Sequence, residues 1–235
     1  MAVSLSAQQN LFNIPSGDIT PARQFFYQNQ INFYSPTSFE MKQHFVFGLG
    51  KGWDAGINLL NVKMNAGKKG PFFDFYDQPD EMTRPLAPML MFTVQKKISL
   101  TTKVELLAGT QHGFNVSRHS SKMRYATFNY AAVVWHPGHH LHIVAGPYFA
   151  NRPYSGSSLV IGAMGGFDWQ FHKRVSLMAD YVLGNNYLGA TVVGCNVTAT
   201  PKFQLCIGAL LPNGWVNTYG VVLEINALSY SVWGH

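Results

Sequence analysis

The chain has 235 residues and a mass of 26.2 kDa, with 47% hydrophobic but only 12% charged residues. Disordered chains combine low hydrophobicity with high charge, so this composition excludes intrinsic disorder. No stretch reaches the ~18 apolar residues of a membrane-spanning helix. Low charge without a long apolar run is typical of a membrane β-barrel or of an unusually apolar soluble β-protein.

Net charge and cysteine content exclude several further classes. The net charge is +6, but the 17 Lys and Arg residues are scattered in ones and twos rather than gathered on one face, so no nucleic-acid partner is expected. Two cysteines exclude a disulfide scaffold and multi-cysteine zinc patterns. Residues 1–18 lack the basic region and apolar core of a signal peptide. We therefore expect a chain that is not exported or a mature form that begins at Met1.

Apolar and polar residues alternate with a period of two along the chain. In the segment 39–50, Phe45 and Phe47 fall on one face while His44 and Gly48 fall on the other. Because successive side chains of a strand point to opposite faces, each such segment is predicted to be a strand with one apolar face. In chain order the segments are 23–34, 39–50, 53–64, 87–95, 100–111, 123–135, 140–149, 158–171, 175–184, 187–198, 202–210 and 218–227.

The connections between these segments are sorted by length. Every second connection is tight, as at 50–52 and 172–174, whereas the connections 65–86, 112–122 and 211–217 are clearly longer. Short turns that alternate with longer loops, on an even number of strands, are typical of outer-membrane barrels.

The sequence therefore predicts an all-β fold, a closed antiparallel transmembrane β-barrel of about 12 strands in an up-and-down meander over residues 21–235. Each segment has about the 9–11 residues that a tilted strand needs to cross a bilayer, and closure pairs every strand with two neighbours. We expect residues 1–20 to form a periplasmic N-terminal segment, and the sequence leaves open whether this segment inserts into the barrel as a plug.

Two segments carry a likeness to known proteins. They read GLGKGWDAGINL (48–59) and GGFDWQFHKRVSLMADYVLGNNYLG (165–189), and in each a strand ends in a short turn before the next strand returns with small and apolar residues. The chain resembles bacterial outer-membrane β-barrel proteins of the small porin-like kind. The resemblance implies location in a bacterial outer membrane, with membrane lipid and lipopolysaccharide as partners.

If the apolar strand faces meet lipid, the opposite faces line a lumen. Polar residues on these faces are predicted to line the pore and to set its preference for ions or solutes. They are Glu40, Lys42, His44, Asp54, Asn58, Lys103, Glu105, His142, Asp168, Gln170, Asp180 and Glu224. A constriction is expected where five charges lie on neighbouring strands, at Glu40, Lys42, Asp54, Lys103 and Glu105.

We interpret this pattern as a passive pore for small solutes, with no catalytic residue and no cofactor. Two alternatives stay open. One is a closed structural or surface-contact barrel, in which the inward charges pair with one another. The other is a soluble β-barrel that binds an apolar ligand. The oligomeric state is not assigned.

The 65–86 loop is long for a compact domain, and such loops are usually functional or disordered. Four aromatic residues argue against disorder, namely Phe72, Phe73, Phe75 and Tyr76. We expect these residues either to fold into the barrel mouth as a constriction or to form an external lid or contact surface.

Histidines suggest two further chemistries. His136, His139, His140 and His142 cluster at a tight turn, but three or four converging ligands are needed for a metal and no carboxylate is adjacent, so no metal site is expected. Some outer-membrane barrels are lipid hydrolases with a His and a Ser two residues apart on the outer wall. His119 and Ser121 have this spacing, and a hydrolase remains a minor alternative.

The two cysteines lie in neighbouring segments. If Thr200 and Pro201 form a two-residue turn, Cys195 lies directly opposite Cys206, and a cross-strand disulfide becomes an option in an oxidising compartment. Two unpaired thiols are the alternative.

Overall fold

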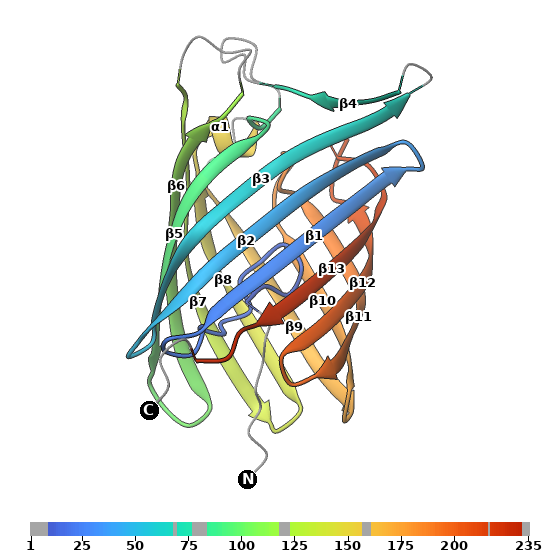
Figure 1. Ribbon diagram of the computed structural model, residues 1–235. Coiled ribbons are helices and arrows are strands. Elements are labelled where there is room, and N and C mark those ends of the chain that lie inside the picture. Colours follow the sequence, from blue (N-terminus) through green and yellow to red (C-terminus); the bar gives the residue numbers. More distant parts are fainter. Residues whose placement is uncertain are drawn as a thin grey trace.

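The computed structural model describes residues 9–67, 70–76, 84–117, 123–156, 161–215 and 217–231. Over these residues it contains thirteen strands and one short helix (Figure 1). They are β1 (Phe25–Ser35), β2 (Ser38–Gly50), β3 (Trp53–Gly67), β4 (Gly70–Asp74), β5 (Met89–Ser99), β6 (Val104–Asn115), β7 (Tyr125–Gly138), β8 (Leu141–Ala150), α1 (Arg152–Ser155), β9 (Ile161–His172), β10 (Val175–Val182), β11 (Ala190–Thr200), β12 (Phe203–Pro212) and β13 (Gly220–Leu228).

Twelve of these strands close into a barrel. β1 pairs with β13 on one side and with β2 on the other, and β2 pairs in turn with β3, which completes the ring through β5 to β12. Every pairing is antiparallel and almost every one joins strands that are consecutive in the chain, as in an up-and-down meander. The predicted twelve strands and the closed antiparallel barrel are therefore confirmed.

Two elements were not predicted from the sequence. β4 pairs with the end of β3 and lies outside the ring, at the upper end of Figure 1. β3 changes its partner near Asn61, which has a φ of 57°: residues 53–60 pair with β5, and residues 63–67 pair with β4. Asn tolerates this left-handed conformation better than most residues. The second element, α1, begins after Asn151, whose side chain accepts a hydrogen bond from the Tyr154 backbone N–H.

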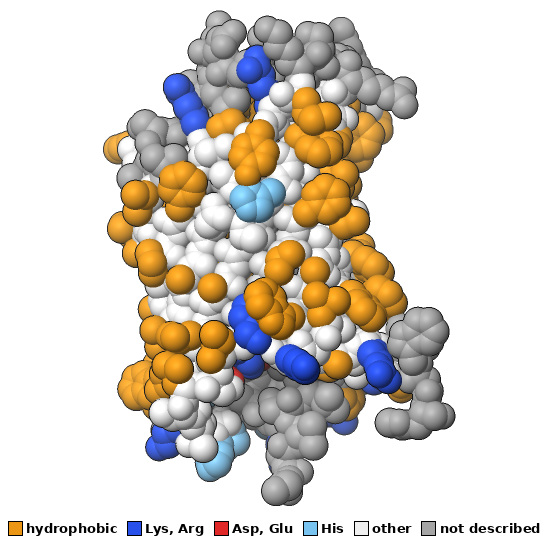
Figure 2. All heavy atoms as spheres, turned by 90° about the vertical axis from the view of Figure 1, so that its left-hand side faces the viewer, with side chains coloured by type: hydrophobic (Ala, Val, Ile, Leu, Met, Phe, Trp, Pro, Cys, Tyr) orange, Lys and Arg blue, Asp and Glu red, His pale blue; other side chains and the backbone are white. Residues whose placement is uncertain are grey.

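The two faces of the wall differ in polarity as the alternation requires. In β12, Gln204 and Cys206 are buried inside the barrel, whereas Leu205 and Ile207 are exposed on the outside. Figure 2 shows hydrophobic side chains spread over the outer wall, with Lys and Arg gathered toward its ends. No helix in the described part of the chain is long and apolar enough to span a membrane.

Residues 9–20 lie within the ring (Figure 1). Residues 9–16 form a short hairpin, in which Leu11 N donates to Ile14 O and Ser16 N donates to Gln9 O. We call residues 9–20 the N-terminal segment. Its side chains at Leu11, Phe12 and Ile14 are at most 1% exposed, and they pack in one cluster with inward residues such as Tyr148, Met178 and Val222. The main hydrophobic core of the protein is therefore inside the barrel.

Candidate functional site

Eleven of the twelve predicted lining residues lie on the inward faces of their strands. Asp54, Asn58, Asp180 and Glu224 are at most 1% exposed. Gln170, at the lower end of β9, is on the inward face but open to solvent.

Lys103 was wrongly placed on a strand. It lies in the exposed turn between β5 and β6, because β6 begins only at Val104. The Thr101 hydroxyl stabilises this turn by accepting hydrogen bonds from the backbone N–H groups of Lys103 (3.1 Å) and Val104 (3.0 Å).

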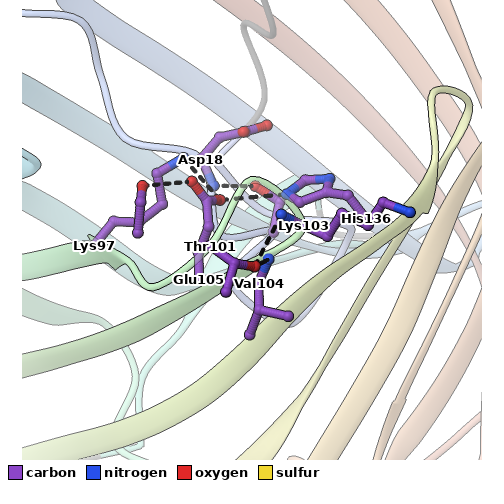
Figure 3. A network of polar contacts seen from close by, with 9 residues as sticks. Asp18, Lys97, Thr101, Lys103, Val104, Glu105 and His136 are labelled. Atoms are coloured by element: carbon purple, nitrogen blue, oxygen red, sulfur yellow. Dashed lines mark hydrogen bonds and ion pairs between the residues drawn. The ribbon is translucent and has the colours of Figure 1, made fainter.

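The predicted five-charge constriction does not form. Antiparallel strands run in opposite directions, so Glu40 near the start of β2 and Asp54 near the start of β3 are at opposite ends of the barrel. Glu105 lies at the lower end, between Lys97 (3.2 Å) and His136 (3.3 Å), with Asp18 of the N-terminal segment nearby (Figure 3). The charges are therefore split between the two openings.

Three of the four aromatic residues of the 65–86 loop lie outside the ring, whereas Tyr76 packs against the buried cluster of Leu60, Leu86, Met89, Met91 and Ala126. Phe72, Phe73 and Phe75 are 54%, 51% and 40% exposed, on or just after β4 and outside the ring. Tyr76 is tied by backbone hydrogen bonds to Ala87. Of the two alternatives for this loop, the constriction does not hold for Phe72, Phe73 and Phe75, because β4 pairs with the edge of β3 instead of folding inward.

Of the two alternatives for the cysteines, the structure has the unpaired thiols and not the disulfide. An irregularity between Thr198 and Thr200 shifts the register, so Cys195 pairs with Ile207 and Cys206 pairs with Asn196. A shift of one residue puts the two side chains on opposite faces of the sheet. Cys206 points inward, where its sulfur contacts the amides of Asn196 and Asn226, each at 3.7 Å.

Two inward carboxylates hold the N-terminal segment in place. Asp54 accepts hydrogen bonds from Gln9 Nε2 (2.6 Å) and from the Thr20 backbone N–H (2.9 Å). Asp180, on the opposite wall, accepts from the backbone N–H groups of Phe12 (3.1 Å) and Asn13. A buried charge is costly unless it is hydrogen-bonded, and bonds to a charged acceptor are among the strongest in proteins. The segment therefore provides the described donors of Asp180 and adds to the one that Asp54 receives from Gln95 in the wall (3.1 Å).

Amide side chains of β1 form a second set of contacts, which the sequence interpretation missed. Asn10 Nδ2 donates to Gln28 Oε1 (2.6 Å), and Gln30 Nε2 lies 3.4 Å from Asn13 Oδ1. Gln28, Gln30 and Asn32 are all at most 1% exposed. Their spacing of two residues along a strand was a visible signal for an inward polar row.

Two wall glycines make room for the apolar side chains of the N-terminal segment. A Cβ at Gly166 would lie 2.6 Å from Cδ1 of Leu11, and a Cβ at Gly208 would lie 3.0 Å from Cζ of Phe12. The space beside these inward glycines is filled by Leu11 and Phe12.

Above the N-terminal segment lies a cavity of about 410 Å³, which we call the vestibule. Its floor is formed by the N-terminal segment, at residues such as Phe12 and Asn13. Polar side chains from β1 to β3 form one wall, at Gln30, Asn32, Glu40, Lys42, Asn61 and Lys63. Mostly apolar side chains from β7 to β12 and α1 form the other, at Phe128, Tyr154, Met164, Val182, Ala190 and Leu210.

The clustered histidines do not converge on one point. The rings of His136 and His142 are 4.7 Å apart, while His139 and His140 are exposed in the turn between β7 and β8. Within the described ranges, no group of three or more His, Cys, Asp or Glu side chains is arranged to hold a metal ion.

A group of polar side chains on the outer wall is linked by hydrogen bonds between its own members. His112 contacts the Thr110 hydroxyl (2.5 Å) through Nε2 and the Tyr125 hydroxyl through Nδ1. Thr110 also donates to Asn129 Oδ1 (2.6 Å), and Asn129 donates to Thr127 (2.9 Å). The sequence interpretation did not identify this group. The pair it did consider for a hydrolase, His119 and Ser121, lies outside the described residues.

Comparison with known proteins finds likeness in structure alone. No protein-family model matches the chain, and no curated protein matches it. The NanC porin is similar with a TM-score of 0.54 and 13% identity, over 88% of this chain and 100% of that one. An outer membrane channel from Pseudomonas putida F1 gives 0.51 and 14%, over 90% and 95%. Outer membrane phospholipase A from Escherichia coli gives 0.51 and 10%, over 91% and 99%. The chain therefore has the fold of small outer-membrane barrels, a fold shared by channels and by an enzyme.

Proposed function

We propose that this protein is a passive pore for small solutes in a bacterial outer membrane. The observation that carries the proposal is a closed ring with an apolar outer wall and a polar, charged cavity at one end. Only closed barrels and helices satisfy their backbone groups within lipid, and polar interiors are typical of barrels that pass solutes. The similar NanC porin and Pseudomonas putida F1 channel support the same function. Membrane lipid and lipopolysaccharide would contact the outer wall.

In this proposal the N-terminal segment acts as a plug that limits the width of the pore. It occupies the lower lumen and contacts opposite walls through Asp54 and Asp180. Solutes then cross only when the segment shifts from these contacts. The remainder of the barrel, which we place at residues 21–235, is the membrane-spanning domain.

The proposal assigns no catalytic residue and no cofactor. The lining groups act by charge and hydrogen bonding on whatever solute passes.

Single-channel recording in planar bilayers tests the pore. The full chain, refolded in detergent, is expected to give brief unitary currents above a closed baseline. A protein that inserts, shown by heat-modifiable migration on gels, but stays silent at all voltages would overturn the proposal.

A cysteine pair tests the plug. In a background with Cys195→Ser and Cys206→Ser, the changes Asn10→Cys and Gln28→Cys place two thiols where side chains are now in contact. Oxidation is expected to abolish the openings and reduction to restore them. Either single cysteine is the matched control and should conduct under both conditions. Unchanged currents after complete cross-linking would contradict the plug.

A closed structural or surface-contact barrel is the second candidate function. The filled lower lumen is the observation that favours it, since Leu11 and Phe12 leave little room beside the wall. Silence of both the native chain and the loosened variants described below, with correct insertion, is the outcome expected for this candidate. A soluble barrel would instead stay monodisperse without detergent.

A further inference from the structure

The vestibule has two chemically unlike walls. The wall from β1 to β3 presents amides and charges, whereas the wall from β7 to β12 presents aliphatic and aromatic carbon. A cavity of about 410 Å³ is within the ~300–1,000 Å³ range of small-molecule sites. A ligand that fills it must therefore offer a polar part and an apolar part on opposite sides.

The two lysines of the polar wall differ in their partners. Lys63 Nζ lies 3.6 Å from the Glu40 carboxylate and 5.6 Å above the ring of Tyr187. Lys42 Nζ has a different environment, with the amide oxygen of Asn13 at 3.4 Å. Within the described part of the chain, no carboxylate forms a salt bridge with Lys42. An ammonium group in a lined cavity without a counter-ion favours an anion from solution.

The apolar wall is built to receive a flat or linear hydrocarbon. The rings of Phe128 and Tyr154 stack with centroids 5.1 Å apart and an interplanar angle of 20°. Met164 and Leu210 line the same cavity. Burial raises the pKa of the Tyr154 phenol, so this wall adds no negative charge that would repel an anion. Methionine in particular adapts its shape to different apolar groups.

We infer that the vestibule is a binding site for a small amphipathic anion. Its carboxylate, or a similar anionic group, pairs with Lys42, and its aromatic or alkyl body packs on Phe128, Tyr154 and Met164. This inference rests on the proposed pore function and names the class of solute that the pore would favour.

An anion bound at Lys42 also affects a contact of the N-terminal segment. Lys42 and the Asn13 amide share a contact, and Asn13 belongs to the floor of the vestibule. An anion that takes the ammonium group competes with the Asn13 oxygen. Ligand binding is therefore expected to loosen one contact between the N-terminal segment and the wall.

Calorimetric titration of the full chain in nonionic detergent tests the inference, with titration into empty micelles as the blank. Three probes separate the two parts of the ligand. Phenylacetate carries both parts, phenylacetamide keeps the apolar body without the charge, and gluconate keeps the charge without the apolar body. Phenylacetate is expected to bind at least tenfold more tightly than either of the others. Equal affinity for the acid and its amide, or preference for gluconate, would overturn the inference.

Two variants locate the site. Lys42→Gln is expected to weaken phenylacetate binding at least tenfold and to leave phenylacetamide unchanged, whereas Lys103→Gln, in the exposed turn at the other end, should change neither. Met164→Gln should weaken both aromatic probes and spare gluconate. An unchanged affinity of Lys42→Gln for phenylacetate places the site elsewhere and refutes the inference. The comparison of acid and amide uses the unaltered chain, so it decides the question even for a variant that does not fold.

The outcomes distinguish this inference from the pore itself. Unitary currents without any preference for phenylacetate would refute the binding site and leave the pore. Selective binding by a correctly inserted but silent protein would refute the pore and leave a receptor for amphipathic anions.

Discussion

The lower lumen and the vestibule are enclosed by the same twelve strands but are occupied in opposite ways. In the lower lumen one carboxylate oxygen each of Asp54 and Asp180 accepts hydrogen bonds from the N-terminal segment. In the vestibule, Lys42 has only the Asn13 amide as a described side-chain partner, and it lines the cavity. The lower lumen is therefore filled by a segment that is not part of the barrel strands, and the cavity begins above that segment.

The largest effect is expected when an anchor of the lower lumen is removed. Asp180→Ala leaves the backbone N–H groups of Phe12 and Asn13 without their acceptor, at a cost of about 1–3 kcal/mol each. The open fraction in single-channel records should rise about tenfold or more, since 1.4 kcal/mol corresponds to a factor of ten.

Glu224→Gln is the matched control for this prediction. Glu224 is as buried as Asp180, but its hydrogen-bond partners Asn226, Gln28 and Cys206 belong to the wall and not to the N-terminal segment. The open fraction of this variant should stay at the native value. Equal opening of both variants would mean that charge in the lumen, rather than the anchor, controls the passage.

Overfilling the lower lumen should have the next largest effect. A Cβ at Gly208 would lie 2.8 Å from Cγ1 of Val192 and 3.0 Å from Cζ of Phe12, so Gly208→Val displaces Phe12 at a cost of about 1–3 kcal/mol. Amide hydrogen exchange over residues 9–20 should accelerate. Gly138→Ala is the control, because nothing lies within 4 Å of the added Cβ, and its exchange should match that of the native chain.

The labelling rate of the Cys206 thiol reports a smaller effect in the same region. Cys206, on the inward face of β12, is 1% exposed, whereas Cys195 is partly exposed on the outward face of β11. In a Cys195→Ser background, a maleimide should label Cys206 much faster in the denatured than in the folded chain, and Asp180→Ala should narrow this gap. Complete labelling of both thiols of the unaltered chain after denaturation without reductant checks that they are free. A gap that persists in the loosened variant would mean that the segment does not shield Cys206.

The smallest effect is expected in the vestibule. Glu40→Gln removes the partner of Lys63, and partly exposed ion pairs contribute at most about 1 kcal/mol, so the melting temperature should hardly move. Ion preference should change instead, because a second cation of the polar wall is released. The reversal potential in a KCl gradient should shift toward anion selectivity, and Lys103→Gln should leave it unchanged. A shift toward cations would contradict the assignment of charges to the vestibule.

The strands were predictable because their cause is local. Phe45 and Phe47 face one way and His44 and Gly48 the other within a single segment, and a bilayer on one side requires that order along every strand. Gln28, Gln30 and Asn32 obey the same rule and could have been identified as inward residues.

The misplaced residues depend on relations that no single segment contains. One irregularity between Thr198 and Thr200 separates Cys195 from Cys206, and the reversal of direction between β2 and β3 separates Glu40 from Asp54. The contacts of Asp54 and Asp180 with residues 9–20 join parts of the chain up to 168 positions apart. Their donors are mostly backbone N–H groups, which every residue except proline has, so the sequence carries no specific signal for them.

On the outer wall, the hydrogen bonds that link Thr110, His112, Tyr125 and Asn129 make these side chains depend on one another. Where lipid hydrocarbon surrounds these side chains, no water is available, so each provides the hydrogen-bond partner that its neighbours need. Loss of one member, as in Thr110→Val, leaves its neighbours without a hydrogen-bond partner. Conversion of the whole group to aliphatic residues leaves no polar group that needs one. Substitutions at these four positions should therefore be correlated, so that all four residues are replaced together or all four are kept.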